Sequence, residues 1–146
     1  ALPVAPGNRR VLVASPQWVE HNGAPQTPDE LTQLNAMTFV LRGRLHDRWT
    51  FTRNGEVSSV QVNGTIMSDD AEVIRRLAIA GEGVAYKSWL DVSEDVRDGR
   101  LQLLMPDYQG EKVPLNMICP HRKQLSTAVR LLHDAVKTRC EMLAQS

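Results

Sequence analysis

The chain has 146 residues, of which 42% are hydrophobic and 23% are charged. This balance is that of an ordinary folded domain and excludes the disordered, collagen-like and low-complexity classes. Seventeen Lys and Arg residues match 17 Asp and Glu residues, so the formal net charge is zero and no strong positive field is available for nucleic acid or an anionic membrane.

The cysteines and the start of the sequence narrow the class further. Two cysteines, Cys119 and Cys140, are too few for the disulfide framework of a small secreted protein, which favours a cytoplasmic location. The chain has no run of about 18 apolar residues for a membrane span, and its start, ALPVAP, lacks the regions of a signal peptide. Because that start also lacks Met, we expect a piece of a longer protein, although Met removal or tag cleavage would give the same start.

Prolines and capping residues mark the first elements. An apolar run over residues 9–14 stops at Ser15-Pro16, which predicts a strand followed by a short helix over 16–21. A second cap-and-proline pair predicts another short helix over 28–34. The continuous apolar run over 36–41 predicts a strand that is buried on both faces.

The middle of the chain predicts a hairpin and then a helix. Residues 49–52 alternate, and Asn54-Gly55 is a dipeptide that favours the positive φ angles of a hairpin turn. Further on, Asp69 is expected to cap a helix that has Glu72 in its first turn and ends at Gly81.

The rest of the chain returns to strands and closes with a long helix. Short apolar runs predict strands over 84–86, 101–105 and 115–119. Residues 126–143 carry apolar side chains at spacings of three and four in two lines, so this amphipathic helix is expected to have neighbours on two sides. Strands that alternate with helices predict an α/β fold with a mixed, mostly parallel sheet and an antiparallel insertion.

Five stretches, in their order and spacing, resemble the effector-binding domain of LysR-type transcriptional regulators. They are RVLVASP (10–16), NGAPQTPDEL (22–31), AGEGVA (80–85), GRLQLLMPDY (99–108) and CPHR (119–122). The resemblance covers nearly the whole chain, which makes it more specific than any single motif.

This resemblance implies a lobe of the periplasmic-binding-protein-like (type 2) fold. In the family, a winged helix-turn-helix binds DNA, and a two-lobed domain binds a small-molecule effector in the cleft between its lobes. The resemblance implies that residues 1–8 are the end of lobe one or a linker, that 9–120 are lobe two, and that 121–146 are the helix returning to lobe one. It also implies self-association as a homodimer or tetramer, DNA contact only through a segment outside this chain, and no membrane contact.

Four side chains are candidates for the effector site. Arg42 and Arg44 follow the strand over 36–41, whose carboxyl end the resemblance places at the cleft; they would bind an anion, or else form a solvated basic loop. Ser68 lies at a helix N-terminus, where free N–H groups favour anions. Many family members have an apolar pair and Pro where this chain has YKSW. Lys87 follows the short strand over 84–86 in an apolar context, and three interpretations stay open: pairing with a buried carboxylate, reaching the cleft, or extending into solvent.

The sequence does not indicate an enzyme. No Gly-x-Ser-x-Gly motif occurs, and neither Cys119 with His121 nor His133 with Cys140 has a second pair at metal-ligand spacing. We therefore expect no catalytic, metal or cofactor site. The predicted function is the effector-sensing domain of a cytoplasmic LysR-type regulator. The alternatives are a lobe of a periplasmic solute-binding protein and, third, an enzyme of the same two-lobed architecture.

Overall fold

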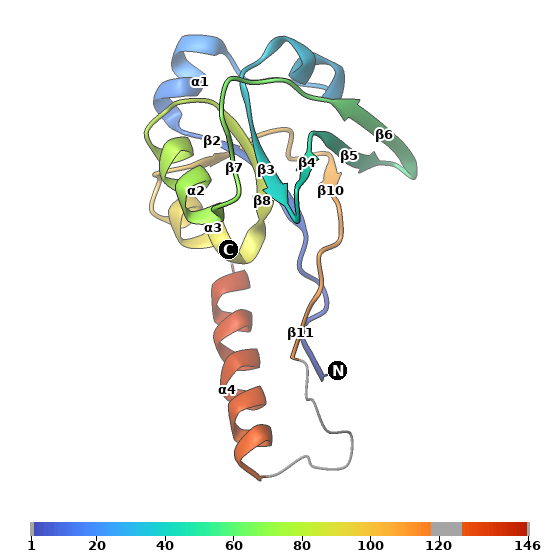
Figure 1. The fold of residues 1–146 in the computed structure, drawn as a ribbon, viewed down its shortest axis with the longest axis vertical. Coiled ribbons are helices and arrows are strands. Elements are labelled where there is room, and N and C mark those ends of the chain that lie inside the picture. Colours follow the sequence, from blue (N-terminus) through green and yellow to red (C-terminus); the bar gives the residue numbers. More distant parts are fainter. Residues whose placement is uncertain (1, 118–126, 146) are drawn as a thin grey trace.

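The protein consists of a body of strands and helices from which a long helix and a two-stranded ribbon extend (Figure 1). The structure is a computed structural model and describes residues 2–117 and 127–145. The strands are β1 (Leu2–Ala5), β2 (Arg10–Ala14), β3 (Ala36–Leu41), β4 (Arg44–His46), β5 (Arg48–Arg53), β6 (Glu56–Gln61), β7 (Met67–Ser68), β8 (Val84–Ser88), β9 (Gln102–Leu103), β10 (Gln109–Gly110) and β11 (Leu115–Met117). The helices are α1 (Pro16–Asn22), the 3₁₀ helix η1 (Pro28–Gln33), α2 (Ala71–Ile79), α3 (Trp89–Arg97) and α4 (Thr127–Ala144).

The central sheet has six strands, in the order β4-β3-β8-β2-β9 with β7 also beside β3. Strands β3, β7, β8 and β9 run in one direction, so the sheet is mixed and mostly parallel in orientation. Antiparallel neighbours nevertheless outnumber parallel ones, three pairs to two among the described residues, because β2 lies between β8 and β9 and runs against both. Hydrophobic periodicity reports neither strand order nor direction, so the sequence could not predict that β2 lies between β8 and β9.

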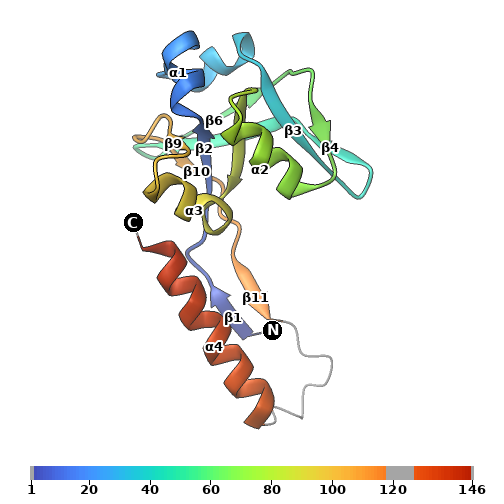
Figure 2. The ribbon, with the colours of Figure 1, turned by 90° about the vertical axis from the view of Figure 1, so that its left-hand side faces the viewer.

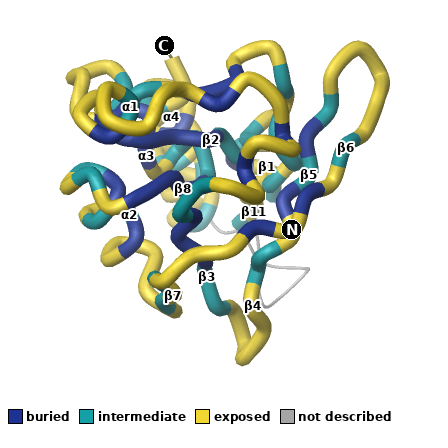
Figure 3. The backbone as a smooth tube through the Cα atoms, turned by 90° about the horizontal axis from the view of Figure 1, so that it is seen from above, coloured by how far each residue is buried: buried dark blue, intermediate teal, exposed yellow. Residues whose placement is uncertain are grey.

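Each face of the sheet packs on its own hydrophobic cluster. Along β2, Leu12 faces α1, η1 and the small second sheet, whereas Val13 faces α2 and α3. This period of two agrees with a strand that is covered on both sides, and the buried strands occupy the centre of the body in Figure 3. Fully burying a large apolar side chain stabilises the fold by about 1.5 to 3 kcal/mol, so the two clusters supply the main driving force.

The predicted antiparallel insertion is confirmed. Strands β5 and β6 form a hairpin, and β10 pairs with the other edge of β5. The turn residues Asn54 and Gly55 have φ angles of 51° and 81°, the left-handed values that a two-residue hairpin turn requires.

Tyr86 joins this insertion to the central sheet. Its ring lies 5.3 Å from the Trp49 ring and 4.9 Å from the Phe51 ring, measured between centroids. Its hydroxyl donates to the Thr50 carbonyl oxygen at 2.6 Å and accepts from the Glu111 N–H at 2.7 Å. Burial raises the pKa of the Tyr86 hydroxyl to about 12.

The first two helices begin where the proline pattern placed them. The Ser15 hydroxyl accepts from the Trp18 N–H at 3.0 Å, and the Glu30 carboxylate accepts from the Thr27 N–H at 2.8 Å. The second of these helices, η1, has 3₁₀ rather than α geometry.

The cap of α2 corrects the sequence-based prediction by one residue. Asp70, not Asp69, is the N-cap, and its Oδ1 accepts from the Glu72 and Val73 N–H groups at 2.9 and 3.4 Å. The cause is β7, which pairs with β3 as far as Ser68 and so delays the helix. Two adjacent Asp residues offer two capping registers, and strand pairing decides between them.

The glycines of the AGEGVA stretch have distinct structural reasons. Gly81 has a φ of +87°, which is strained for any other residue. A Cβ on Gly83 would lie 2.4 Å from the Asn35 carbonyl oxygen, so a side chain there would push β8 away from the chain entering β3. This stretch therefore sets the packing of two central strands.

Helix α3 was missed by the sequence analysis, although its signal is present. Trp89, Val92 and Val96 repeat at helical spacing, and Gly99, with a φ of +79°, follows the helix end. Short strands were also missed or shortened: β1, β4, β7 and β10 were not predicted, and of the run over 101–105 only β9 forms. The predicted strand over 115–119 is confirmed as far as Met117, and its last residues lie outside the described part.

Helix α4 lies alongside β1, and its C-terminal end reaches α3 (Figure 2). The Trp89 indole N–H donates to the Ala144 carbonyl oxygen at 2.9 Å, and Arg97 donates to the Leu143 carbonyl oxygen. Near the ribbon, His133 Nε2 lies 2.8 Å from the Pro3 carbonyl oxygen. The helix is thus held mainly at two places by polar contacts.

Candidate functional site

The candidate site is a pocket of about 330 Å³ in the body. Strands β3, β4, β5 and β8 and the first turns of α2 and α3 contribute to its lining, and the segments that lead into the β1–β11 ribbon close one side. On that side, Asn8 Nδ2 donates to the Ser88 hydroxyl at 2.7 Å and to the Val113 carbonyl oxygen at 3.0 Å. Elements far apart in the sequence therefore meet at one cavity.

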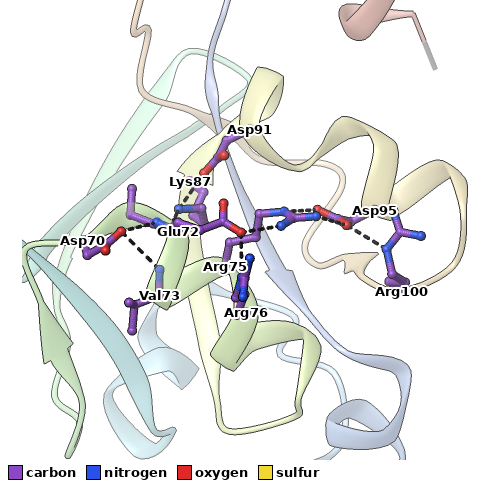
Figure 4. A network of polar contacts seen from close by, with 10 residues as sticks. Asp70, Glu72, Val73, Arg75, Arg76, Lys87, Asp91, Asp95 and Arg100 are labelled. Carbon is purple, nitrogen blue, oxygen red and sulfur yellow. Dashed lines mark hydrogen bonds and ion pairs between the residues drawn. The ribbon is translucent and has the colours of Figure 1, made fainter.

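Lys87 is a buried cation in the wall of this pocket. Its side chain is only 7% exposed, so the interpretation that it extends into solvent is wrong. Nζ lies 2.6 Å from Asp91 Oδ2 (Figure 4) and donates to the Ala71 carbonyl oxygen at 2.8 Å. Lys87 therefore has a carboxylate partner, but that partner is exposed rather than buried. Its part in effector binding stays a prediction.

A second ion pair lies on the ribbon side of the pocket. Arg10 Nε is 3.3 Å from Glu111 Oε2, and both side chains are partly exposed. Arg48, at the start of β5, also lines the pocket, but its guanidinium forms no hydrogen bond or ion pair within residues 2–117 and 127–145. Of the three cationic side chains in the lining, Arg10 and Lys87 therefore have a carboxylate partner, and Arg48 has none among the described residues.

Apolar side chains line the rest of the cavity. Met37 and Ile74 come from the cluster under α2, and Phe39 packs at its edge. Trp49 is 4% exposed, and its indole N–H donates to the His46 carbonyl oxygen at 3.2 Å. A ligand there would meet an apolar wall and fixed charges together, which is the usual composition of a small-molecule site.

An ion network around the buried Asp95 joins α2 to α3 (Figure 4). Asp95 is only 1% exposed. Its carboxylate accepts two hydrogen bonds from Arg75, at 2.7 and 2.8 Å, and one from Arg100 at 2.8 Å. Burial alone would raise the pKa of Asp95, but these hydrogen bonds outweigh it and hold the pKa below its usual range. Arg75 also pairs with Glu72 at 2.8 Å, so the network reaches the first turn of α2.

The other three predicted site residues lie outside the lining of this pocket. Arg42 and Gly43, with φ angles of 53° and 76°, form the turn of a tight β3–β4 hairpin, and Arg44 opens β4. Both arginines are exposed. Ser68 is half-buried, and its hydroxyl accepts from the Asp70 N–H at 3.0 Å. Their part in binding stays a prediction.

Sequence reasoning missed most of the charged lining. Arg10, Arg48, Asp91 and Glu111 were not singled out, because each is unremarkable within its own element and the four meet only through the sheet topology. One signal was available: Asp91 follows Lys87 by four residues, and recognising α3 would have placed both at its start.

The other candidate groups of the sequence are the paired Cys and His residues. No group of three or more His, Cys, Asp or Glu side chains within residues 2–117 and 127–145 could hold a metal ion. His133 and Cys140 have other roles: the first contacts Pro3 and the second is buried in α4. Cys119 and His121 lie outside the described residues. None of the described helices is long and apolar enough to cross a membrane.

Comparison with known proteins decides the family. Residues 2–141 match the model of the LysR substrate binding domain. The chain belongs to this family. Among curated relatives, it is 27% identical to the HTH-type transcriptional regulator DmlR and 29% identical to the transcriptional activator TtdR, both of Escherichia coli K12. Each match covers 85% of the chain, which spans only 39% of either relative.

Solved structures of LysR-type regulators share the fold. The full-length virulence activator AphB of Vibrio cholerae is 24% identical, with a TM-score of 0.73 over 92% of this chain and 46% of that one. The regulatory domain of CrgA from Neisseria meningitidis is 17% identical, with a TM-score of 0.67 over 93% of this chain and 67% of that one. The predicted periplasmic-binding-protein-like α/β fold of a LysR substrate-binding domain is confirmed.

Proposed function

We propose that this chain is the effector-sensing part of a cytoplasmic LysR-type transcriptional regulator and that the pocket beside Lys87 is its effector site. The observation that carries the proposal is the pocket itself: a cavity of about 330 Å³ that is lined by both apolar and charged side chains, in a LysR substrate-binding domain. The effector is a small molecule, and the domain needs no cofactor.

The position of the pocket supports a sensing role. Its lining includes Asn8, Val113 and Leu115, which adjoin or belong to the β1–β11 ribbon, so a bound molecule would contact the body and the ribbon at once. A ligand shifts a conformational equilibrium only by its difference in affinity for the two states. A site between the body and the ribbon provides such a difference in affinity if the angle between the body and the ribbon differs between the two states.

The boundaries and partners of the parent protein are part of the same proposal. Residues 1–8 are the end of lobe one or a linker, 9–120 are lobe two, and 121–146 are the helix returning to lobe one. The parent self-associates and contacts DNA through a segment outside this chain. The regulators that match the chain favour this function over a periplasmic solute-binding lobe or an enzyme.

A thermal-shift screen of small metabolites tests the proposal. Compounds that bind the folded chain raise its melting temperature. Ala71 is exposed and lines the pocket, so Ala71→Trp fills the cavity, whereas Ala80→Trp places the same bulk on an exposed residue at the other end of α2. We expect at least one compound to stabilise the wild type and Ala80→Trp but not Ala71→Trp. Stabilisation that survives in Ala71→Trp, or no stabilising compound at all, would reject the pocket as the effector site.

A further inference from the structure

The charges in the pocket do not balance. Its lining holds three cationic side chains, Arg10, Arg48 and Lys87, and two carboxylates, Asp91 and Glu111. Lys87 lies 2.6 Å from Asp91, and Arg10 lies 3.3 Å from Glu111, so each carboxylate already has a cation. The Arg48 guanidinium has no such partner among the described residues.

Lys87 is poorly placed to recognise a ligand by charge. It is buried, and its ammonium group already contacts a carboxylate and the Ala71 carbonyl oxygen. The buried ammonium already has its counter-ion, so an anionic ligand would have to displace Asp91 and would compensate no additional charge. Lys87 therefore shapes the wall by holding the first turns of α2 and α3 together.

Arg48 has the opposite properties. It is exposed, and its guanidinium donates to no partner within residues 2–117 and 127–145. Two residues before it, the His46 ring lies 6.4 Å from the Phe39 ring, measured between centroids. A guanidinium binds carboxylates in a bidentate geometry. Phe39 and Trp49 from the same part of the lining supply apolar contacts for the rest of the ligand.

We infer that the pocket takes a compact organic monoanion with an apolar body, and that Arg48 binds its anionic group. This inference rests on the proposed function of the pocket and adds the ligand class and the residue that selects it. One negative charge compensates Arg48, whereas a second would face carboxylates that are already paired. The pocket volume is at the lower end of the range for small-molecule sites, which favours a ligand of about one ring in size.

The test uses the 146-residue chain and three probes of similar shape: phenylacetate, its neutral amide 2-phenylacetamide, and the dianion phenylmalonate. Binding is followed by NMR through the Trp49 indole N–H and the backbone amides of β3 and β8. We expect saturable shifts with phenylacetate and affinity about tenfold higher than for the amide, because a hydrogen bond to a charged group is lost with the charge. Phenylmalonate should bind no more tightly than phenylacetate.

Variants of exposed arginines locate the charge contact. Arg48→Gln should remove the preference for the acid over the amide, while Arg53→Gln, at the other end of β5 and outside the pocket lining, should keep it. Arg42→Gln tests the rival prediction from the sequence. If Arg42→Gln removes the preference and Arg48→Gln keeps it, the assignment to Arg48 is wrong.

The remaining outcomes separate this inference from the proposed function. Equal binding of acid and amide in the pocket would overturn the anion class but leave the pocket as a ligand site. Tighter binding of phenylmalonate would overturn the single charge. If phenylacetate shifts no pocket resonance, the ligand class is wrong, and the thermal-shift screen with Ala71→Trp still decides on the pocket.

Discussion

The body and helix α4 differ in how completely they cover their own apolar surface. In the body, two hydrophobic clusters cover the two faces of the sheet. The buried polar groups of Tyr86 and Asp95 are hydrogen-bonded to Thr50 and Arg75. In α4, Cys140 is the only buried residue, while Leu131, Leu132 and Met142 are 65%, 58% and 54% exposed. The body thus buries most of its large apolar side chains within the chain, whereas α4 leaves several of its own exposed.

The largest effect is expected at Asp95. Asp95→Asn should lower the free energy of unfolding by about 3 kcal/mol, the lower end for breaking a buried ion pair, since Arg75 and Arg100 keep side-chain exposures of 25% and 42%. Asp98→Asn is the matched control: Asp98 is 59% exposed and pairs only with Arg100, so its loss should cost under about 1 kcal/mol. Urea unfolding measures both, and equal costs would show that the network does not hold α2 to α3.

The same carboxylate predicts an acid dependence. Because the folded state holds the pKa of Asp95 below its usual range, its contribution is present above the unfolded value of about 4 and is lost as pH falls below it. The unfolding free energy of the wild type should therefore fall more steeply below about pH 4 than that of Asp95→Asn. Parallel curves for the two proteins would contradict the assignment.

A smaller loss is expected at Tyr86. Tyr86→Phe keeps the ring contacts but leaves the Thr50 carbonyl and the Glu111 N–H without their partner, at a cost of about 1 to 3 kcal/mol. In the folded state the pKa of Tyr86 is about 12, above the usual value near 10. The contribution of the hydroxyl to stability is therefore fully present below about pH 10 and is lost as pH rises towards 12. Urea unfolding at pH 8 and 11 should show a loss in the wild type that exceeds the loss in Tyr86→Phe. An equal loss in both proteins would show that the Tyr86 hydroxyl is not the cause of the alkaline loss of stability.

Substitutions on helix α4 should change the self-association of the chain rather than its free energy of unfolding. Leu132→Glu removes an exposed apolar side chain, so we expect a change in unfolding free energy within about 0.5 kcal/mol but weaker self-association in sedimentation. Glu141→Gln is a control on the same helix that leaves the apolar side chains in place. A wild-type chain that is a monodisperse monomer, with α4 fully protected in hydrogen exchange, would remove the need for a partner.

No measurable effect is expected for DNA. With a formal net charge of zero, the chain should show no salt-dependent binding to duplex DNA. Fluorescence anisotropy at about 150 mM salt measures this, and submicromolar affinity would contradict the proposal that DNA contact lies outside this chain.

The sequence predicted those elements whose signals are local. The Ser15 cap, the Asn54-Gly55 turn and the strand over residues 36–41 follow from neighbouring residues, and the structure confirms them. The resemblance to LysR-type regulators, carried by five spaced motifs, predicted the family and fold correctly. Asp69 was wrong as a cap because pairing between β7 and β3, which is not local, fixes the start of α2.

The candidate site was harder to predict because it is assembled by topology. Lys87 was singled out because it follows a short strand in an apolar context, but its pairing with Asp91 depends on α3, which was missed. Arg42 was placed in a strand-end loop, whereas a two-residue turn folds β4 back along β3. Arg48 lies at a strand start with no motif around it, and only the arrangement of the strands brings it to the pocket.

The most direct test of the central claim is hydrogen exchange of the wild-type chain with and without the most stabilising compound from the thermal-shift screen. If the pocket is the effector site, exchange should slow at β3, β8 and the first turn of α3, and the β5–β6 hairpin tip at Asn54-Gly55 should be unaffected. The same compound should leave the exchange of Ala71→Trp unchanged. Protection confined to elements outside the pocket, or equal protection in Ala71→Trp, would contradict the account.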